Sequence, residues 1–228
     1  MLSESKLHGP RVVATVHSQA GLRLAEQLGP ADVDLLEIRV DALANKLAGV
    51  RRLAANANVP ILLTVRHPAE GGIGNLSAAT RRKLLAEFLP AAAFVDLELR
   101  SAAAMRDLIA AAKERGTRVV ISDHHFHRTP TLVQMRERRA RAFALGADVF
   151  KLACLACEAG AVARLLDFVA EGKAGPVAVM GMGKFGQVSR LVLACAGSTL
   201  NYGYLHRPNA PGQWEARELK ALLRRLGK

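Results

Sequence analysis

Short apolar segments of strand character alternate with longer amphipathic segments of helix character along the whole chain. The helix patterns include residues 76–89 and 101–116, the second of which ends in glycine. About eight strand–helix units in 228 residues predict a closed (β/α)8 barrel, or TIM barrel, formed by residues 1–228 as a single domain. An open, doubly wound sheet is the alternative. The predicted strands are residues 11–18, 34–41, 60–67, 94–99, 118–126, 148–155, 176–183 and 200–205.

The strand segments themselves favour the barrel. A parallel sheet covered by helices on both faces has strands that are apolar throughout, whereas several of these segments alternate. In residues 61–66 the odd-numbered side chains are apolar, while Thr64 and Arg66 share the other face. A barrel explains such polar faces, because the inward face near the C-terminal end of each strand opens into the active site.

The same alternation predicts one cavity lined by charges from several strands. A buried ion network that only stabilises the barrel is the alternative for any single strand. Convergence of charges from several strands favours a functional site instead. The predicted inward set is Glu37, Arg39, Arg66, Asp96, Glu98, His124 and Lys151.

Lys151 is the single charge within the apolar part of residues 148–157. An ammonium group is costly to desolvate, and burial beside Arg39 and Arg66 would favour the neutral amine, which attacks a ketone and forms a Schiff base. The protonated imine then draws electrons from the neighbouring carbon, so a base can remove a proton there. His124 lies on the adjacent segment, faces inward and titrates in the required range.

Composition restricts the partners. Lys and Arg number 32 against 20 Asp and Glu, a formal charge of +12, which suits nucleic acid or an anionic small molecule. With 4% aromatic residues the chain offers few stacking platforms, so we expect no nucleic-acid partner. The absence of a signal-peptide pattern and of a long apolar run predicts a cytoplasmic protein without a membrane partner. The 3 cysteines are expected to be small buried thiols.

The segment GMGKFG at residues 181–186 matches G-x-G-x-x-G after a predicted strand. No acidic residue follows about twenty positions later, so a Rossmann cofactor is not predicted. We expect these glycines to let a loop approach a ligand, and the following helix with Arg190 to hold a phosphate or a carboxylate. His125 and His127 lack a converging third ligand, so no metal site is predicted.

Seven segments in order resemble those of the type I 3-dehydroquinate dehydratase family, and they cover the chain nearly end to end. Each segment is weak evidence alone, but together they are specific. They are EIRVD at 37–41, TVRHPAEGG at 64–72, VDLEL at 95–99, SDHHFHRTP at 122–130, FKLA at 150–153, MGMGKFGQVSR at 180–190 and APGQ at 210–213.

This resemblance implies a cofactor-free and metal-free (β/α)8 lyase of the shikimate pathway, which serves aromatic amino acid biosynthesis by converting 3-dehydroquinate to 3-dehydroshikimate. By position, Lys151 resembles the imine-forming lysine, His124 the general acid/base and Glu70 the carboxylate that orients it. A homodimer is expected. The positions that resemble substrate-binding residues are Glu37, Arg39, Arg66, Arg190, Asn209 and Gln213, with Arg190 meeting the carboxylate.

The chain departs from the family pattern in three places. His125 stands where the family usually has Asp, Asn209 stands where it often has Ser, and the N-terminal hairpin that plugs the barrel is expected to be reduced or absent. Two other functions therefore stay open: another Schiff-base-forming (β/α)8 enzyme such as a class I aldolase, and a non-catalytic binding protein that retains the pocket.

Overall fold

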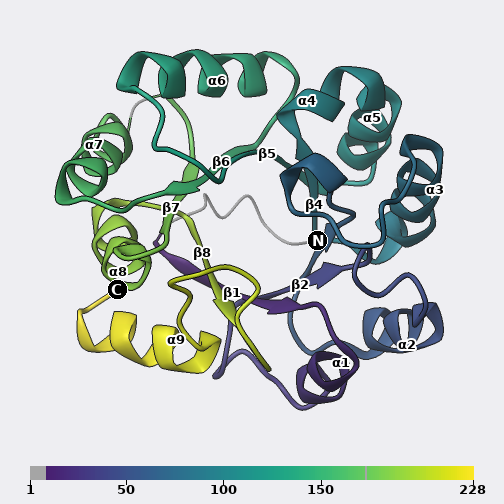
Figure 1. Cartoon of the computed structure of the whole chain (residues 1–228). Coiled ribbons are helices and arrows are strands. Elements are labelled where there is room, and N and C mark those ends of the chain that lie inside the picture. Colours follow the sequence, from purple (N-terminus) through teal and green to yellow (C-terminus); the bar gives the residue numbers. More distant parts are fainter. Residues whose placement is uncertain (1–8, 173) are drawn as a thin grey trace.

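In a computed structural model that describes residues 9–172 and 174–228, eight parallel strands form a ring that helices surround (Figure 1). The (β/α)8 prediction is confirmed, and each predicted strand contains an observed one. The strands are β1 Arg11–Val16, β2 Leu35–Arg39, β3 Ile61–Thr64, β4 Phe94–Glu98, β5 Arg118–His125, β6 Val149–Leu155, β7 Val177–Met182 and β8 Leu200–Tyr204. The α-helices are α1 Gln19–Ala25, α2 Leu47–Asn56, α3 Ala78–Phe88, α4 Leu99–Ala102, α5 Arg106–Glu114, α6 Leu132–Ala144, α7 Ala159–Ala170, α8 Gly186–Ala196 and α9 Ala216–Arg225; the 3-10 helices are η1 Pro68–Glu70, η2 Leu89–Ala91 and η3 Ala103–Met105.

The strands follow the order β7-β6-β5-β4-β3-β2-β1-β8, with parallel pairing between neighbours. The seam between β7 and β8 is bridged by the residues that precede β8. Thr199 N donates to Val177 O at 2.8 Å, and Val179 N donates to Ser198 Oγ at 2.9 Å. A hydroxyl side chain therefore takes the place of a ladder bond where the barrel closes.

Period-two alternation separates two apolar cores. Ile61, Leu63 and Val65 belong to the core between the barrel and its helices, whereas Leu62 belongs to the core inside the barrel. An apolar inward residue near the start of each strand fills the N-terminal part of the barrel. These residues include Val13, Leu35, Leu62, Phe94, Val120, Val149, Ala178 and Leu200. The charged inward residues follow them along the strands, so the polar chemistry collects at the C-terminal end.

Three sequence expectations need comment. The helix predicted over 101–116 is broken into α4, η3 and α5, because the backbone at Met105, with φ −115° and ψ 27°, leaves the helical region. The prediction of buried thiols is wrong for Cys157, which is exposed because β6 ends at Leu155. The prediction about the N-terminal hairpin falls on residues 1–8, outside the described residues. No helix of the described residues has the length and apolar character that crossing a bilayer requires.

Two large aromatic side chains, from β6 and α7, pack against each other in the outer core. Phe150 and Phe168 are both fully buried and meet edge to face, with ring centroids 6.3 Å apart. We expect Phe168→Ala to lower the free energy of unfolding by about 3–5 kcal/mol, because it removes a buried ring and leaves a cavity. Urea denaturation followed by circular dichroism measures this. The matched control is Val133→Ala on α6, where the side chain is 59% exposed, and its change should stay within about 0.5 kcal/mol.

Candidate active site

One cavity at the C-terminal ends of the strands contains every residue that the sequence assigned to catalysis or substrate binding. Asp96 and Glu98, the other inward charges, do not line it and are buried instead. The cavity lining is Thr15, Glu37, Arg39, Arg66, Glu70, Gly71, His124, Phe126, Lys151, Ala153, Met180, Met182, Arg190, Tyr202, Asn209, Ala210 and Gln213.

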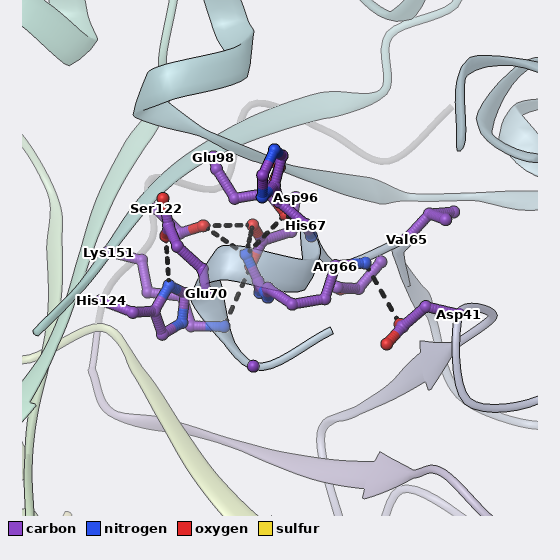
Figure 2. Close-up of polar contacts among 12 residues, drawn as sticks. Asp41, Val65, Arg66, His67, Glu70, Asp96, Glu98, Ser122, His124 and Lys151 are labelled. Atoms are coloured by element: carbon purple, nitrogen blue, oxygen red, sulfur yellow. Dashed lines mark hydrogen bonds and ion pairs between the residues drawn. The ribbon is translucent and has the colours of Figure 1, made fainter. Parts of the chain in front are cut away.

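Asp96 joins the two cations nearest the bottom of the site (Figure 2). Arg66 donates to both of its carboxylate oxygens, at 3.0 and 2.8 Å, and Lys151 Nζ lies 2.9 Å from Oδ2. Burial alone would raise the pKa of Asp96, but Arg66 and Lys151 outweigh it and hold that pKa well below its ordinary range. Asp96 is therefore a permanent negative charge between the two cations.

Arg66 continues into a fully buried network. Its Nη1 also donates to Glu98 at 3.2 Å and to Ser122 Oγ at 2.6 Å, and Glu98 forms a second ion pair with Arg81. These bonds occupy much of the Arg66 guanidinium, although the side chain lines the cavity. The buried ion network considered from the sequence is thus present, but it supports the cavity and does not replace it.

Lys151 is 4% exposed and lies between two carboxylates. Besides Asp96, Glu37 Oε1 is 3.5 Å from its Nζ, and Glu37 itself accepts hydrogen bonds from Thr15 and Thr64, both at 3.0 Å. The sequence predicted arginine neighbours for Lys151, but in the structure two carboxylates also contact its Nζ. Strand alternation identifies the shared face, but it does not say which inward charges come into contact.

His124 and Glu70 form a pair at the rim of the cavity. The chain turns after β3 into η1, which brings Glu70 back over β5, and His124 Nδ1 lies 2.8 Å from Glu70 Oε2 (Figure 2). Phe126 stacks on the imidazole, with ring centroids 6.3 Å apart. Arg100 is 3.5 Å from the other Glu70 oxygen. The second imidazole nitrogen is left to the cavity side, where Lys151 also lies.

Burial shifts both members of this pair toward their neutral forms. It raises the pKa of Glu70 to about 8, with the Glu98 carboxylate adding to the effect and Arg66 opposing it. It lowers the pKa of His124 well below the ordinary value, and Arg66 and Lys151 lower it further. Near neutral pH the imidazole is therefore uncharged, which is the state in which it accepts a proton.

Arg39 and Asp41 fix the loop that carries Glu70. Arg39 donates to both Asp41 oxygens, at 2.9 and 2.7 Å, and to Gly71 O at 3.0 Å. Asp41 in turn accepts from the backbone N–H groups of Arg66 and Ile73. One face of Arg39 is thus used structurally, while the side chain still borders the cavity.

Arg190 is the uncompensated charge of the site. Its side chain is buried, and it donates only to carbonyl oxygens, at 3.1 Å to Gly212 and 2.9 Å to Tyr202. It has no ion pair with a carboxylate in the part of the chain that the structure describes. Burial lowers its pKa to about 10. A buried guanidinium in this state suits an anionic ligand group.

The segment after β8 closes over this arginine. Gln213 Oε1 accepts from the backbone of Asn209 at 2.8 Å and of Ala210 at 3.2 Å. The GMGKFG glycines make this approach possible: a Cβ on Gly186 would lie 2.7 Å from Gly212 Cα. The glycines were expected to let a loop approach a ligand; in the structure Gly186 instead admits the backbone of the segment that borders the cavity.

Sequence reasoning missed some residues of the lining, above all Tyr202, Thr15 and Phe126. The first two lie at inward positions of β8 and β1, so alternation could have found them had uncharged side chains been considered. His125 lies outside the cavity and pairs with Asp123 at 2.8 Å. Within residues 9–172 and 174–228, no group of three or more His, Cys, Asp or Glu side chains is placed to hold a metal ion.

Comparisons with known proteins agree on one family. The family model for type I 3-dehydroquinase matches residues 12–228. The 3-dehydroquinate dehydratase of Methanocella arvoryzae is 36% identical over 96% of this chain and 97% of its own. Among solved structures, 3-dehydroquinate dehydratase from Geobacillus kaustophilus is 29% identical with a TM-score of 0.86, over 96% of this chain and 92% of its own. The type I enzyme from Clostridium difficile, described with covalent modified comenic acid, is 26% identical with a TM-score of 0.84, over the same shares of the two chains.

The raised pKa of Glu70 makes stability depend on pH. Between its ordinary value of 4.5 and its folded value of about 8, the folded protein keeps a proton that the unfolded chain releases. The contribution of Glu70 to the free energy of unfolding should therefore fall as the pH rises through this range, so the stability difference between the parent protein and Glu70→Gln should shrink. Urea denaturation at several pH values measures the slope. Glu137→Gln, an exposed carboxylate on α6, is the control; equal slopes for all three proteins would contradict the prediction.

The contact between Gly186 and Gly212 can be tested with Trp214, the single tryptophan, whose Nε1 donates to Gln187 O at 2.9 Å. We expect Gly186→Ala to displace the segment around Gly212, shift the emission of Trp214 to longer wavelength and increase its quenching by acrylamide. Gly160→Ala on α7 is the control, because a Cβ there meets nothing within 4 Å. Identical spectra for both variants would show that the close approach does not hold the segment.

Proposed function

Because the chain belongs to the type I 3-dehydroquinase family, we propose that it dehydrates 3-dehydroquinate to 3-dehydroshikimate through a Schiff base on Lys151. One observation carries the mechanism: a buried lysine and a carboxylate-bound histidine, from neighbouring strands, line the same cavity. The barrel is proposed to act as a single catalytic domain. Neither a metal nor an organic cofactor is needed in this chemistry.

The first step is imine formation. The Lys151 ammonium releases one proton, the neutral amine attacks the ketone carbon, and that proton is taken up again as the ketone oxygen leaves as water, so the product is a protonated imine. The resulting iminium is a cation at the place where the ammonium stood. Asp96 and Glu37, which lie 2.9 and 3.5 Å from Nζ, are in position to stabilise that cation. Their role is electrostatic, and it persists through the reaction because neither strand has to move.

The second step is the elimination. The iminium acidifies the neighbouring carbon, His124 removes a proton there, and the electron pair forms the new double bond as the hydroxyl group leaves. The same imidazolium then protonates the departing hydroxyl, so the proton returns to solvent as part of water. Glu70 holds Nδ1 and thereby keeps the other ring nitrogen directed at the substrate. Hydrolysis of the product imine restores Lys151.

Arg190 is proposed to bind the substrate carboxylate, because it is a buried cation without a carboxylate partner in the described residues. Asn209 and Gln213 would cover the ligand from the segment above it, while Glu37, Arg39 and Arg66 border it from the strands. Excluding water from the cavity would protect the iminium from premature hydrolysis.

The two departures from the family pattern at positions 125 and 209 are compatible with this mechanism. His125 pairs with Asp123 and does not border the cavity, and Asn209 contributes its backbone N–H to the bond with Gln213. A relative from Acinetobacter baylyi, 31% identical over 85% of this chain, is named a catabolic 3-dehydroquinate dehydratase. The biosynthetic role, the homodimer, the cytoplasmic location and the lack of nucleic-acid and membrane partners stay predictions.

Borohydride reduction in the presence of 3-dehydroquinate tests the covalent step. Peptide mass mapping should find a substrate-sized adduct on Lys151, together with product formation in the untreated protein. His124→Ala should still form the adduct but lower kcat by about 10² or more, the usual scale for a general acid/base.

Lys184→Met is the matched control, since Lys184 follows β7 near the cavity without lining it. This variant should keep both adduct and turnover. An adduct without product in the parent protein would favour a binding protein. No adduct at all would remove the Schiff base, and full activity of His124→Ala would assign the proton transfer to another group.

A further inference from the structure

Tyr202 lies deep in the cavity and none of the steps above uses it. It occupies an inward position of β8 and is 3% exposed. Its ring faces Lys151, with Nζ only 3.9 Å from the ring centroid, which is a close cation–π contact. Its carbonyl oxygen also accepts the bond from Arg190 Nη1, at 2.9 Å. One residue thus contacts both groups that would hold opposite ends of the substrate, the ketone and the carboxylate.

The phenol hydroxyl is buried and has no hydrogen-bond partner among the described residues. A buried hydroxyl without a partner is destabilising, and phenylalanine would fill the same space without that cost. The hydroxyl is therefore a polar group whose partner is missing from the protein itself. Since Tyr202 lines the cavity, a ligand that binds there is the candidate partner for this hydroxyl.

The surroundings keep this hydroxyl protonated. Burial raises the pKa of Tyr202 well above its ordinary value, and the carboxylates of Glu37 and Asp96 raise it further. The group is thus a hydrogen-bond donor at any pH at which the enzyme would work. A neutral ring also keeps the negative π-face that a cation at Lys151 requires.

We propose that Tyr202 is a further substrate-positioning residue: its hydroxyl donates a hydrogen bond to an oxygen of the bound substrate, and its ring face holds the Lys151 nitrogen as a cation. This inference rests on the proposed function, because the ligand is taken to be a hydroxylated ring with a ketone and a carboxylate. The ring acts on the iminium, because its face contacts the nitrogen that carries the positive charge once the Schiff base has formed.

Two variants separate the hydroxyl from the ring. Tyr202→Phe removes only the hydroxyl, so KM for 3-dehydroquinate should rise about 3- to 10-fold, the scale of one hydrogen bond, while kcat changes less than about 2-fold. Tyr202→Leu also removes the π-face, so kcat should fall about a further 10-fold, and borohydride should trap the Lys151 adduct more slowly. Thermal unfolding of each variant separates these effects from loss of folding.

Tyr204→Phe is the matched control, because it is the same change on the same strand at the other tyrosine of the chain, which does not line the cavity. It should keep the parental KM. An active parent protein with a Tyr202→Phe variant of parental KM would overturn the role of the hydroxyl, and a Tyr202→Leu variant equal to Tyr202→Phe would overturn that of the ring. A parent protein that neither binds nor converts 3-dehydroquinate would overturn both this inference and the proposed function.

Discussion

The contact between Asp96 and its two cations, Arg66 and Lys151, is the interaction on which the site depends. Burying a lysine and an arginine inside a barrel is unfavourable unless an anion lies between them, and Asp96 provides that anion at 2.8 to 3.0 Å. Asp96 lies on β4, Lys151 on β6 and Arg66 just after β3, so the contact exists only when these three strands are assembled in the barrel. Glu98, Arg81 and Ser122 extend the same network, so each charge in the layer has a fixed partner.

The functional groups divide between rigid and connecting elements. His124 lies on β5 and Lys151 on β6, two neighbouring strands whose register is set by backbone hydrogen bonds. Glu70 comes from η1, and Gln213 from the segment after β8. Strands fix positions more closely than loops, so the groups proposed to react are the ones that the scaffold positions most precisely. The groups that orient a histidine or cover a ligand lie where the chain can adapt.

Much of this arrangement was predictable from two repeating patterns in the sequence, the alternation of apolar and polar residues along strands and the repeat of strand–helix units. Alternation along β3 separated Arg66 from Leu63, and repeated strand–helix units indicated the barrel. Side-chain pairing was not predictable: nothing local says that Lys151 meets Asp96 while Arg39 turns to Asp41. Tyr202 was missed because an aromatic residue within a strand is usually a core residue. That its hydroxyl lacks a partner among the described residues follows only from the three-dimensional structure. The break at Met105 was not predictable either, because an alanine-rich segment favours a continuous helix.

Gly186 and Gly212 meet through main-chain atoms alone. Such a junction has no side chain through which its geometry could be adjusted, and Gly212, with φ +76°, also needs a backbone conformation that other residues rarely adopt. Next to this junction the segment is also held through main-chain atoms: Gln213 binds the backbone N–H of residue 209 and not its side chain, so this bond is open to any residue there except proline.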